Sequence, residues 1–167
     1  MIKKLENIWG DYMSYNVIDL IDKAIKVCIR KKALYEDIAK RKCEIPSIEI
    51  VASILIKQIN KTIMYYEKLK DEADNDNVEE IAISVYDRIS FLINEFNNKI
   101  YEPHINNVRQ FLEFSLTSEQ DIYSLFIDIQ GRLVKNTSDI NTSTYKILSG
   151  MINNKAEFIS TLEKLIK

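Results

Sequence analysis

The chain has few of the residues that form tight turns or carry chemistry. Its 167 residues include three glycines, two prolines, two cysteines and one histidine. So few glycines and prolines cannot supply the many turns that an all-β fold needs. Histidine and cysteine, on which many catalytic and metal sites depend, are equally scarce. The composition therefore argues against an all-β fold and against the commonest kinds of catalytic or metal site.

A large net charge and long apolar runs are also absent. The formal net charge is −2 and the isoelectric point is about 5.6, whereas nonspecific nucleic-acid binding requires a strongly basic face. No apolar run approaches the roughly 18–20 residues that span a bilayer, and the N-terminal residues do not resemble a signal peptide. Cys28 and Cys43 are too few for a disulfide scaffold. We expect a cytoplasmic protein with free thiols, and neither nucleic acid nor a membrane as its partner.

Apolar residues at helical spacing dominate what remains. Hydrophobic residues make up 46% of the chain and charged residues 29%, as in an ordinary folded domain. Ile48, Leu55, Thr62 and Leu69 recur every seven residues, which is the spacing of a helical bundle or coiled coil. Short connections between long helices favour antiparallel neighbours. The sequence predicts an all-α fold, an antiparallel up-and-down bundle of five to six helices in a single domain over residues 1–167.

Capping and breaking residues predict the helix boundaries. A short helix is expected over residues 2–9, Pro103 is expected to break the chain's middle helices, and Gly150 lies inside the last one. Single residues are expected to cap two of the helices. At two other predicted helix starts, a pair of residues has the spacing of a capping box, which satisfies the free amides of the first turn. The predicted capping residues are Ser14, Ser47, Asp76 with Glu79, and Thr117 with Gln120.

Motifs for catalysis or cofactor binding are missing. A di-iron bundle needs Glu-x-x-His motifs, but the residue three before His104 is Tyr101. A zinc site would have to gather His104, Cys28 and Cys43 without any closely spaced pair of ligands. The glycine-rich phosphate loops are absent as well. We therefore predict no catalytic residue, no cofactor and no metal, and we do not expect an enzyme.

One class of small helical nucleases provides a competing hypothesis. The HEPN class carries an arginine a few residues before a histidine near the start of a helix. Here the order is inverted, because His104 precedes Arg109. The chain is therefore similar to that class in size and helical content but differs from it at the diagnostic motif. An RNA-binding or HEPN-like nucleic-acid-processing protein remains the alternative function, with these two residues as its site.

Charged residues form two clusters that a partner could recognise. The early part of the chain is basic and the middle is acidic, a division that can steer a charged partner. The simpler interpretation, which we favour, is that these residues form a solvated surface. The basic residues at a helix end also complement the helix dipole. The candidate partner-binding residues are Lys23, Lys26, Arg30, Lys40, Arg41 and Lys42 in the basic cluster, and Asp74, Asp76, Glu79 and Glu80 in the acidic one.

The function follows from elimination. A helical bundle without catalytic, metal or nucleotide motifs most often acts through its surface, so we expect a protein-interaction module that binds another protein. An accessory, immunity or regulatory factor would fit this description. Homodimerisation through the seven-residue seam that runs from Ile48 to Leu69 is a further hypothesis.

Overall fold

The structure, a computed structural model, describes residues 14–99 and 103–167. Five α-helices and one short 3₁₀ helix contain most of these residues. They are α1 (Val17–Arg41), α2 (Pro46–Asn75), α3 (Ile83–Lys99), α4 (Val108–Leu133), the 3₁₀ helix η1 (Thr137–Asn141) and α5 (Ser143–Ile166). The extended pairing in these residues is one isolated bridge between Tyr15 and Ile81. The fold is an all-α helical bundle, as the apolar periodicity predicted.

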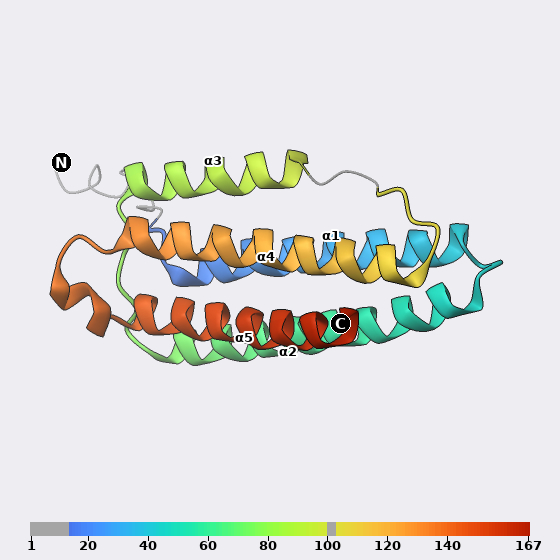
Figure 1. Ribbon diagram of the computed structural model, residues 1–167. Coiled ribbons are helices and arrows are strands. Elements are labelled where there is room, and N and C mark those ends of the chain that lie inside the picture. The colour runs from blue at the N-terminus through green and yellow to red at the C-terminus, as the bar shows by residue number, and fades with distance from the viewer. Residues whose placement is uncertain (1–13, 100–102) are drawn as a thin grey trace, which may run out of the picture.

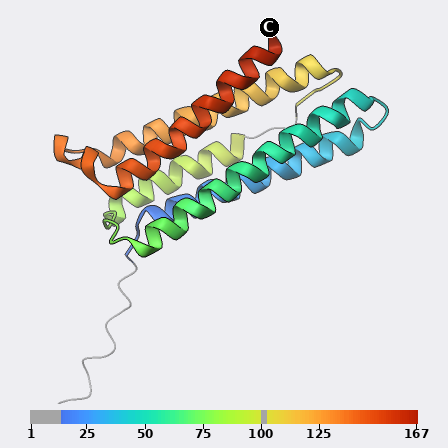
Figure 2. The same ribbon diagram turned by 90° about the horizontal axis from the view of Figure 1, so that it is seen from below.

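The four long helices lie side by side along one axis (Figure 1). The chain reverses direction between α1 and α2 and again between α4 and α5, so that each pair forms a helical hairpin (Figures 1 and 2). The shorter α3 lies on the outside, next to α4. The helix predicted over residues 2–9 lies outside the described residues.

The first helix begins two residues later than predicted. Asn16, and not Ser14, caps α1: its side chain accepts the amide of Ile18, and Asp19 accepts the amide of Asn16 in return. This reciprocal pair satisfies two amides that the first turn leaves without partners. Ser14 has no such role, because the helix starts beyond its reach.

The boundaries of α2 also differ from the prediction. The helix begins at Pro46, whose fixed φ and missing amide suit the first position, so Ser47 lies inside the helix and does not cap it. At its other end α2 continues through the acidic segment that follows Lys70 and stops at Asn75, next to the predicted capping residue Asp76. Asp76 and Glu79 begin no helix, since α3 starts at Ile83.

The third difference concerns α4, which is continuous through the predicted break. Thr117 lies in the middle of this helix, and its hydroxyl donates to the carbonyl of Glu113 one turn earlier. Threonine can make this bond inside a helix, so its presence three residues before Gln120 does not establish a helix start. The described residues therefore hold five α-helices, at the lower end of the predicted range.

The seven-residue seam of α2 faces the core, as expected. Ile48, Leu55, Thr62 and Leu69 are all buried against the chain's own neighbouring helices. The seam therefore offers no exposed surface for the hypothesised homodimer, because its side chains are already covered within one copy. Tyr66 lies in the same core.

Gly150 and Gly131 differ in the space around them. A Cβ at Gly150 would lie 2.8 Å from the hydroxyl oxygen of Tyr65, whereas a Cβ at Gly131 would meet nothing within 4 Å. Alanine is favoured over glycine inside a helix by about 0.5–1 kcal/mol. We expect Gly131→Ala to stabilise the protein by that amount and Gly150→Ala to give less, because Tyr65 must move. The double variant Gly150→Ala/Tyr65→Phe should recover the full gain in thermal unfolding.

An equal gain for the two single alanine variants would contradict this explanation. It would show that the Tyr65 ring moves aside at no cost, and that Gly150 is merely tolerated in α5.

Candidate functional site

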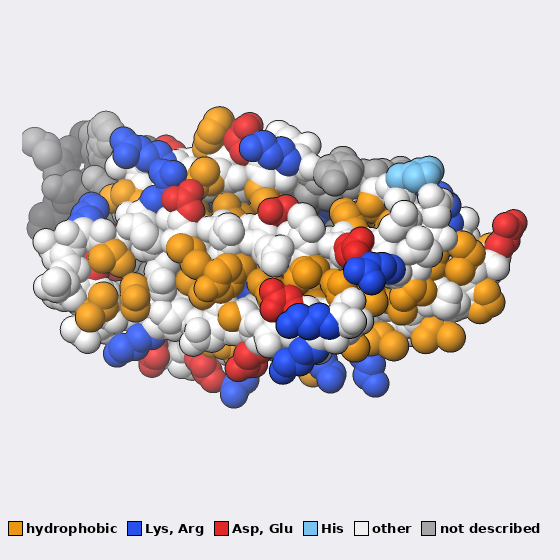
Figure 3. Space-filling view, viewed as in Figure 1, with side chains coloured by type: hydrophobic (Ala, Val, Ile, Leu, Met, Phe, Trp, Pro, Cys, Tyr) orange, Lys and Arg blue, Asp and Glu red, His pale blue; other side chains and the backbone are white. Residues whose placement is uncertain are grey.

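A groove of about 850 Å³ lies between α3 and α4. Figure 3 shows the face of the molecule on which these two helices lie. The apolar lining residues are buried or half-buried and form the floor, whereas most of the polar ones are exposed and form the rim. The apolar lining residues are Leu92, Phe96, Pro103, Ile105, Phe114 and Leu125. The polar lining residues are Glu95, Lys99, His104, Gln110, Glu113, Thr117, Ser118, Asp121, Ser124 and Asp128.

One face of α4 forms the long wall of the groove. Its contributing residues recur every three or four positions from Gln110 to Asp128, which places them along a single face of the helix. Eighteen residue steps at about 1.5 Å each give a wall about 27 Å long. The opposite face of α4 is buried in the core at Phe111, Ile122 and Phe126. Helix α4 therefore contributes one face to the core and another face to the groove.

Acidic side chains outnumber basic ones along the groove. Its lining holds four carboxylates against one lysine and His104. Glu113 accepts a hydrogen bond from Arg109 at 2.9 Å, and Asp128 accepts one from Arg132 at 3.1 Å, both within α4. These exposed pairs are weak. Two carboxylates remain without an ion pair among the described residues, one on each helix: Glu95 on α3 and Asp121 on α4.

A second group of charged residues lies buried on the core side of α4. The Glu119 carboxylate accepts hydrogen bonds from Lys31 of α1 and from Lys155 of α5, the latter at 2.9 Å. The three residues are 1%, 5% and 3% exposed. Three helices are thus joined by one carboxylate and two ammonium groups, a cluster with one positive charge in excess.

Opposing effects set the protonation of this cluster. Burial alone would raise the pKa of the Glu119 carboxyl, but the charges and hydrogen bonds of Lys31 and Lys155 outweigh burial and lower that pKa to about 2. Burial alone would lower the pKa of Lys31, but Glu119 outweighs it, so the pKa of Lys31 is raised. Glu119 therefore stays ionised and has no access to solvent. This suits a structural role in joining three helices, and it does not suit acid–base catalysis.

The two cysteines occupy different surroundings. Cys28 is buried and Cys43 is exposed, and both are free thiols. Burial raises the pKa of the Cys28 thiol; the nearby charges of Lys155, Glu119 and Lys31 have smaller effects. A thiol with a raised pKa is a poor nucleophile, so Cys28 acts as a small core residue.

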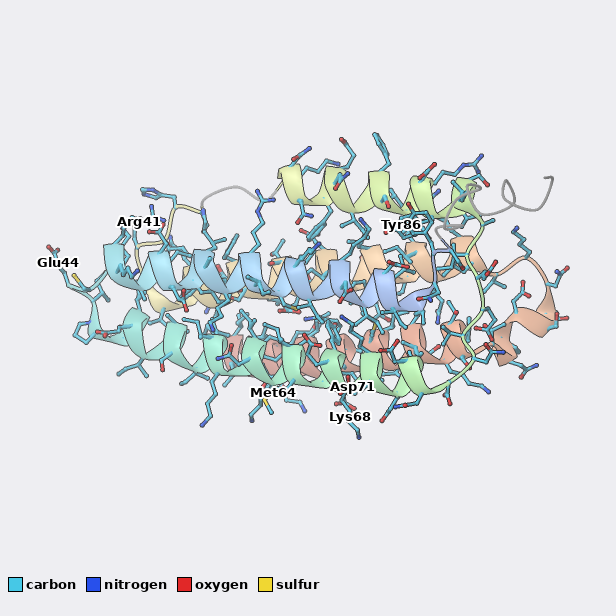
Figure 4. All side chains as sticks on the ribbon, turned by 180° about the vertical axis from the view of Figure 1, so that it is seen from behind. Arg41, Glu44, Met64, Lys68, Asp71 and Tyr86 are labelled. Atoms are coloured by element: carbon cyan, nitrogen blue, oxygen red, sulfur yellow. The ribbon has the colours of Figure 1, made fainter. Side chains whose placement is uncertain are left out.

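The predicted basic residues lie in two places along α1. Lys26 and Arg30 are exposed on successive turns, while Lys23 is half-buried with its ammonium 5.5 Å from the centre of the Tyr86 ring. Arg30 and Lys40 are ten residues apart, which is about 15 Å along the helix axis. Arg41 pairs with Asp37 at 2.9 Å at the far end of α1, where Figure 4 shows it near Glu44. Lys42 is half-buried just beyond the helix.

The predicted acidic residues are also divided. Asp74 and Asp76 are exposed at the end of α2, and Glu80 is exposed in the connection that follows. Glu79 instead binds the start of α5. Its carboxylate accepts the amides of Ser143 and Thr144 at 2.9 and 3.0 Å, and the hydroxyl of Thr144 at 2.9 Å.

Glu79 thus has a structural explanation that the sequence did not reveal. Burial alone would raise its pKa, but the hydrogen bonds from Thr144 and Ser143 lower it. A negative charge at a helix start also complements the helix dipole. Its partners are 64 and 65 residues away in the sequence, so no local pattern could have identified them.

The proposed nucleic-acid residues are placed near acids. His104 is exposed and lines the groove, before the start of α4 and not inside a helix. Arg109 donates to Glu113, whose carboxylate also lines the groove. Among residues 14–99 and 103–167, no three histidine, cysteine or acidic side chains gather as metal ligands would.

Sequence reasoning did not identify the groove or the buried cluster. A signal for the cluster existed: Lys31 lies in phase with the buried residues Cys28 and Tyr35, three before it and four after it. Glu119 and Lys155 are likewise in phase with the buried residues of α4 and α5. A charged residue in an apolar stripe predicts a buried partner. The groove had no comparable signal, because it depends on the separation of α3 from α4.

No helix in the described ranges combines the length and apolar character needed to cross a bilayer. The chain was also compared with known proteins. No protein-family model, curated protein or solved structure matches it.

Proposed function

We propose that this protein is a cytosolic interaction module that binds another protein through the groove between α3 and α4. The observation that carries the proposal is the combination of an apolar floor with an acidic rim along a wall about 27 Å long. Grooves of this kind accept the apolar face of an amphipathic helix. Glu95 and Asp121, on opposite walls, favour a partner whose helix carries lysine or arginine beside its apolar face.

The RNA-binding alternative has less support. His104 and Arg109 are the residues it would use, and both lie near the carboxylate-rich groove. Carboxylates at this position repel a phosphate backbone, because nucleic-acid binding depends on neutralising phosphates with cationic side chains. A protein partner is therefore the function that the geometry favours.

A pair of synthetic peptides tests the proposal. The first is a helix of about 18 residues with leucine at heptad core positions and lysine elsewhere; the second has glutamate in place of lysine. In fluorescence anisotropy the lysine peptide should bind, and the glutamate peptide should bind at least about tenfold more weakly. Raising the salt concentration should weaken the lysine peptide's binding, since exposed charges are screened.

Charge reversal identifies the surface that binds. The variant Glu95→Lys/Asp121→Lys should weaken binding of the lysine peptide by at least about tenfold. The matched control, Glu36→Lys/Glu44→Lys, makes the same change in net charge at exposed positions of α1 and the turn after it. Equal losses in the two variants would reveal a general charge effect, and the groove proposal would then be wrong.

A further inference from the structure

A second apolar and basic surface lies on the outer face of α2. Six exposed residues are spaced alternately four and three positions apart, as in the seam of a coiled coil. They are Ile50, Ile54, Lys57, Lys61, Met64 and Lys68, and we call them the α2 stripe. Figure 4 shows Met64 and Lys68 pointing away from the bundle. The opposite seam of α2 fills the core, so this helix has two heptad faces, only one of which is covered.

The three apolar residues of the α2 stripe are largely exposed to solvent. Ile50 and Ile54 are each 61% exposed, and Met64 is 71% exposed. Leu165 of α5 is also 61% exposed, and it lines a shallow groove together with Ile54. Figure 3 shows hydrophobic side chains gathered where α5 ends and α2 begins. Ile50, Ile54 and Leu165 therefore lie together at one end of the stripe, and apolar residues grouped in this way mark an interaction site more often than scattered ones do.

We propose that the α2 stripe of one copy docks in the α3–α4 groove of a second copy. The inference rests on the proposed function, since it names this chain's own α2 as a helix that the groove accepts. Ile50, Ile54 and Met64 match the apolar floor, while Lys57 and Lys61 match the carboxylates of the rim. The stripe spans 18 residue steps from Ile50 to Lys68, the same length as the α4 wall from Gln110 to Asp128.

Pairing of two α2 stripes with each other is disfavoured. In a symmetric antiparallel pair the centre of the stripe would lie on the two-fold axis. Lys57 of each copy would then face Lys61 of the other, and like charges at such an interface are repulsive. The acidic groove removes this repulsion, and for this reason we assign it, and not a second stripe, as the complementary surface.

The predicted contact is head-to-tail. Figures 1 and 4 place α3 on one side of the bundle and α2 on the opposite side. A copy that uses its groove for one neighbour can therefore use its stripe for another. Contacts between two different surfaces of this kind extend into open chains unless they close into a ring. We expect assemblies that grow with protein concentration and become smaller at high salt.

Two charge-reversed variants of the full chain test this contact. The groove variant is Glu95→Lys/Asp121→Lys, and the stripe variant is Lys57→Glu/Lys61→Glu. Each should weaken self-association by at least about tenfold and remain at the monomer mass of 19.5 kDa in light scattering. The groove variant keeps an intact stripe, and the stripe variant keeps an intact groove. The lysines of the reversed groove also complement the glutamates of the reversed stripe. An equimolar mixture of the two variants should therefore regain assemblies that grow with concentration, although neither variant assembles alone.

A matched control separates the stripe from general charge. Lys135→Glu/Lys146→Glu changes the net charge equally at exposed positions before η1 and on α5, and this variant should assemble like the wild type. The inference is overturned if the wild type stays monomeric at high micromolar concentration, if either charge-reversed variant assembles like the wild type, or if the mixture of the two variants stays monomeric. The peptide titration separates the two proposals: a monomeric wild type that still binds the lysine peptide rejects self-association and retains the proposed function.

Discussion

Replacing Glu119 by glutamine is expected to lower the free energy of unfolding by about 3–5 kcal/mol, as when one partner of a buried ion pair is removed. The substitution keeps the size of the side chain but removes its charge. It leaves the ammonium groups of Lys31 and Lys155 buried together, with no carboxylate to balance them. Both lysines are almost fully covered by the bundle, so neither can turn to water without opening a helix contact.

The excess positive charge of the cluster provides a control. Lys155→Met removes one ammonium group and leaves Lys31 paired with Glu119, a buried pair with no net charge. We expect this variant to lose much less stability than Glu119→Gln in urea-induced unfolding. Equal losses in the two variants would mean that each lysine is needed for packing or hydrogen bonding, and that charge balance does not control the stability of the cluster.

The pH dependence of stability gives an independent measurement. The pKa of Glu119 is lowered from 4.5 to about 2 in the folded chain. A carboxyl with a lowered folded pKa stabilises the fold above its unfolded pKa, and this contribution disappears as the pH falls through the folded pKa. The wild type should therefore lose this contribution between about pH 4.5 and pH 2. Over the same interval the unfolding free energy of Glu119→Gln should change less.

Replacing Phe111 by alanine is expected to lower the free energy of unfolding by about 3–5 kcal/mol. Phe111 has no exposed surface. Its ring and the Tyr35 ring pack in an edge-to-face arrangement, with an interplanar angle of 84° and centroids 5.2 Å apart. The ammonium of Lys31 lies 5.4 Å from the centre of the same Tyr35 ring. The substitution therefore removes a large apolar side chain and opens a cavity beside Tyr35, which the close-packed neighbouring side chains cannot fill.

Phe91→Ala is the matched control, because it makes the same chemical change on α3 at a side chain that is 64% exposed. We expect it to alter the unfolding free energy by no more than about 0.5 kcal/mol. Chemical denaturation of both variants measures the difference. If the two losses were similar, Phe111 would not be the packed core residue that the structure describes.

The position of the buried cluster explains why the binding variants should still fold. Glu119 lies on the core face of α4, while Asp121 lies on the groove face of the same helix. Changes at Asp121 and Glu95 affect exposed side chains and leave the buried Glu119 cluster intact. Surface substitutions away from buried networks usually change stability by about 0.5 kcal/mol or less. Loss of binding in these variants would therefore report on the groove itself.

Apolar periodicity alone was enough to predict the helical class and the inward seam of α2. Ile48, Leu55, Thr62 and Leu69 are buried as their spacing indicated, because a helix that packs along a neighbour buries one face at every second turn. The helix ends were predicted less well. Thr117 can bond within a helix as readily as it can cap one, and Pro46 can begin a helix where Ser47 was expected to cap it.

The sequence by itself determined that this chain forms helices and which face of α2 turns inward, because both depend on contacts between residues three or four positions apart. Only the tertiary structure decided that Lys31, Glu119 and Lys155 share one buried site, that Glu79 binds the start of α5, and that α3 leaves a groove beside α4. Each of these features joins residues far apart in the chain. Their geometry depends on how whole helices pack, and local spacing carries no information about that.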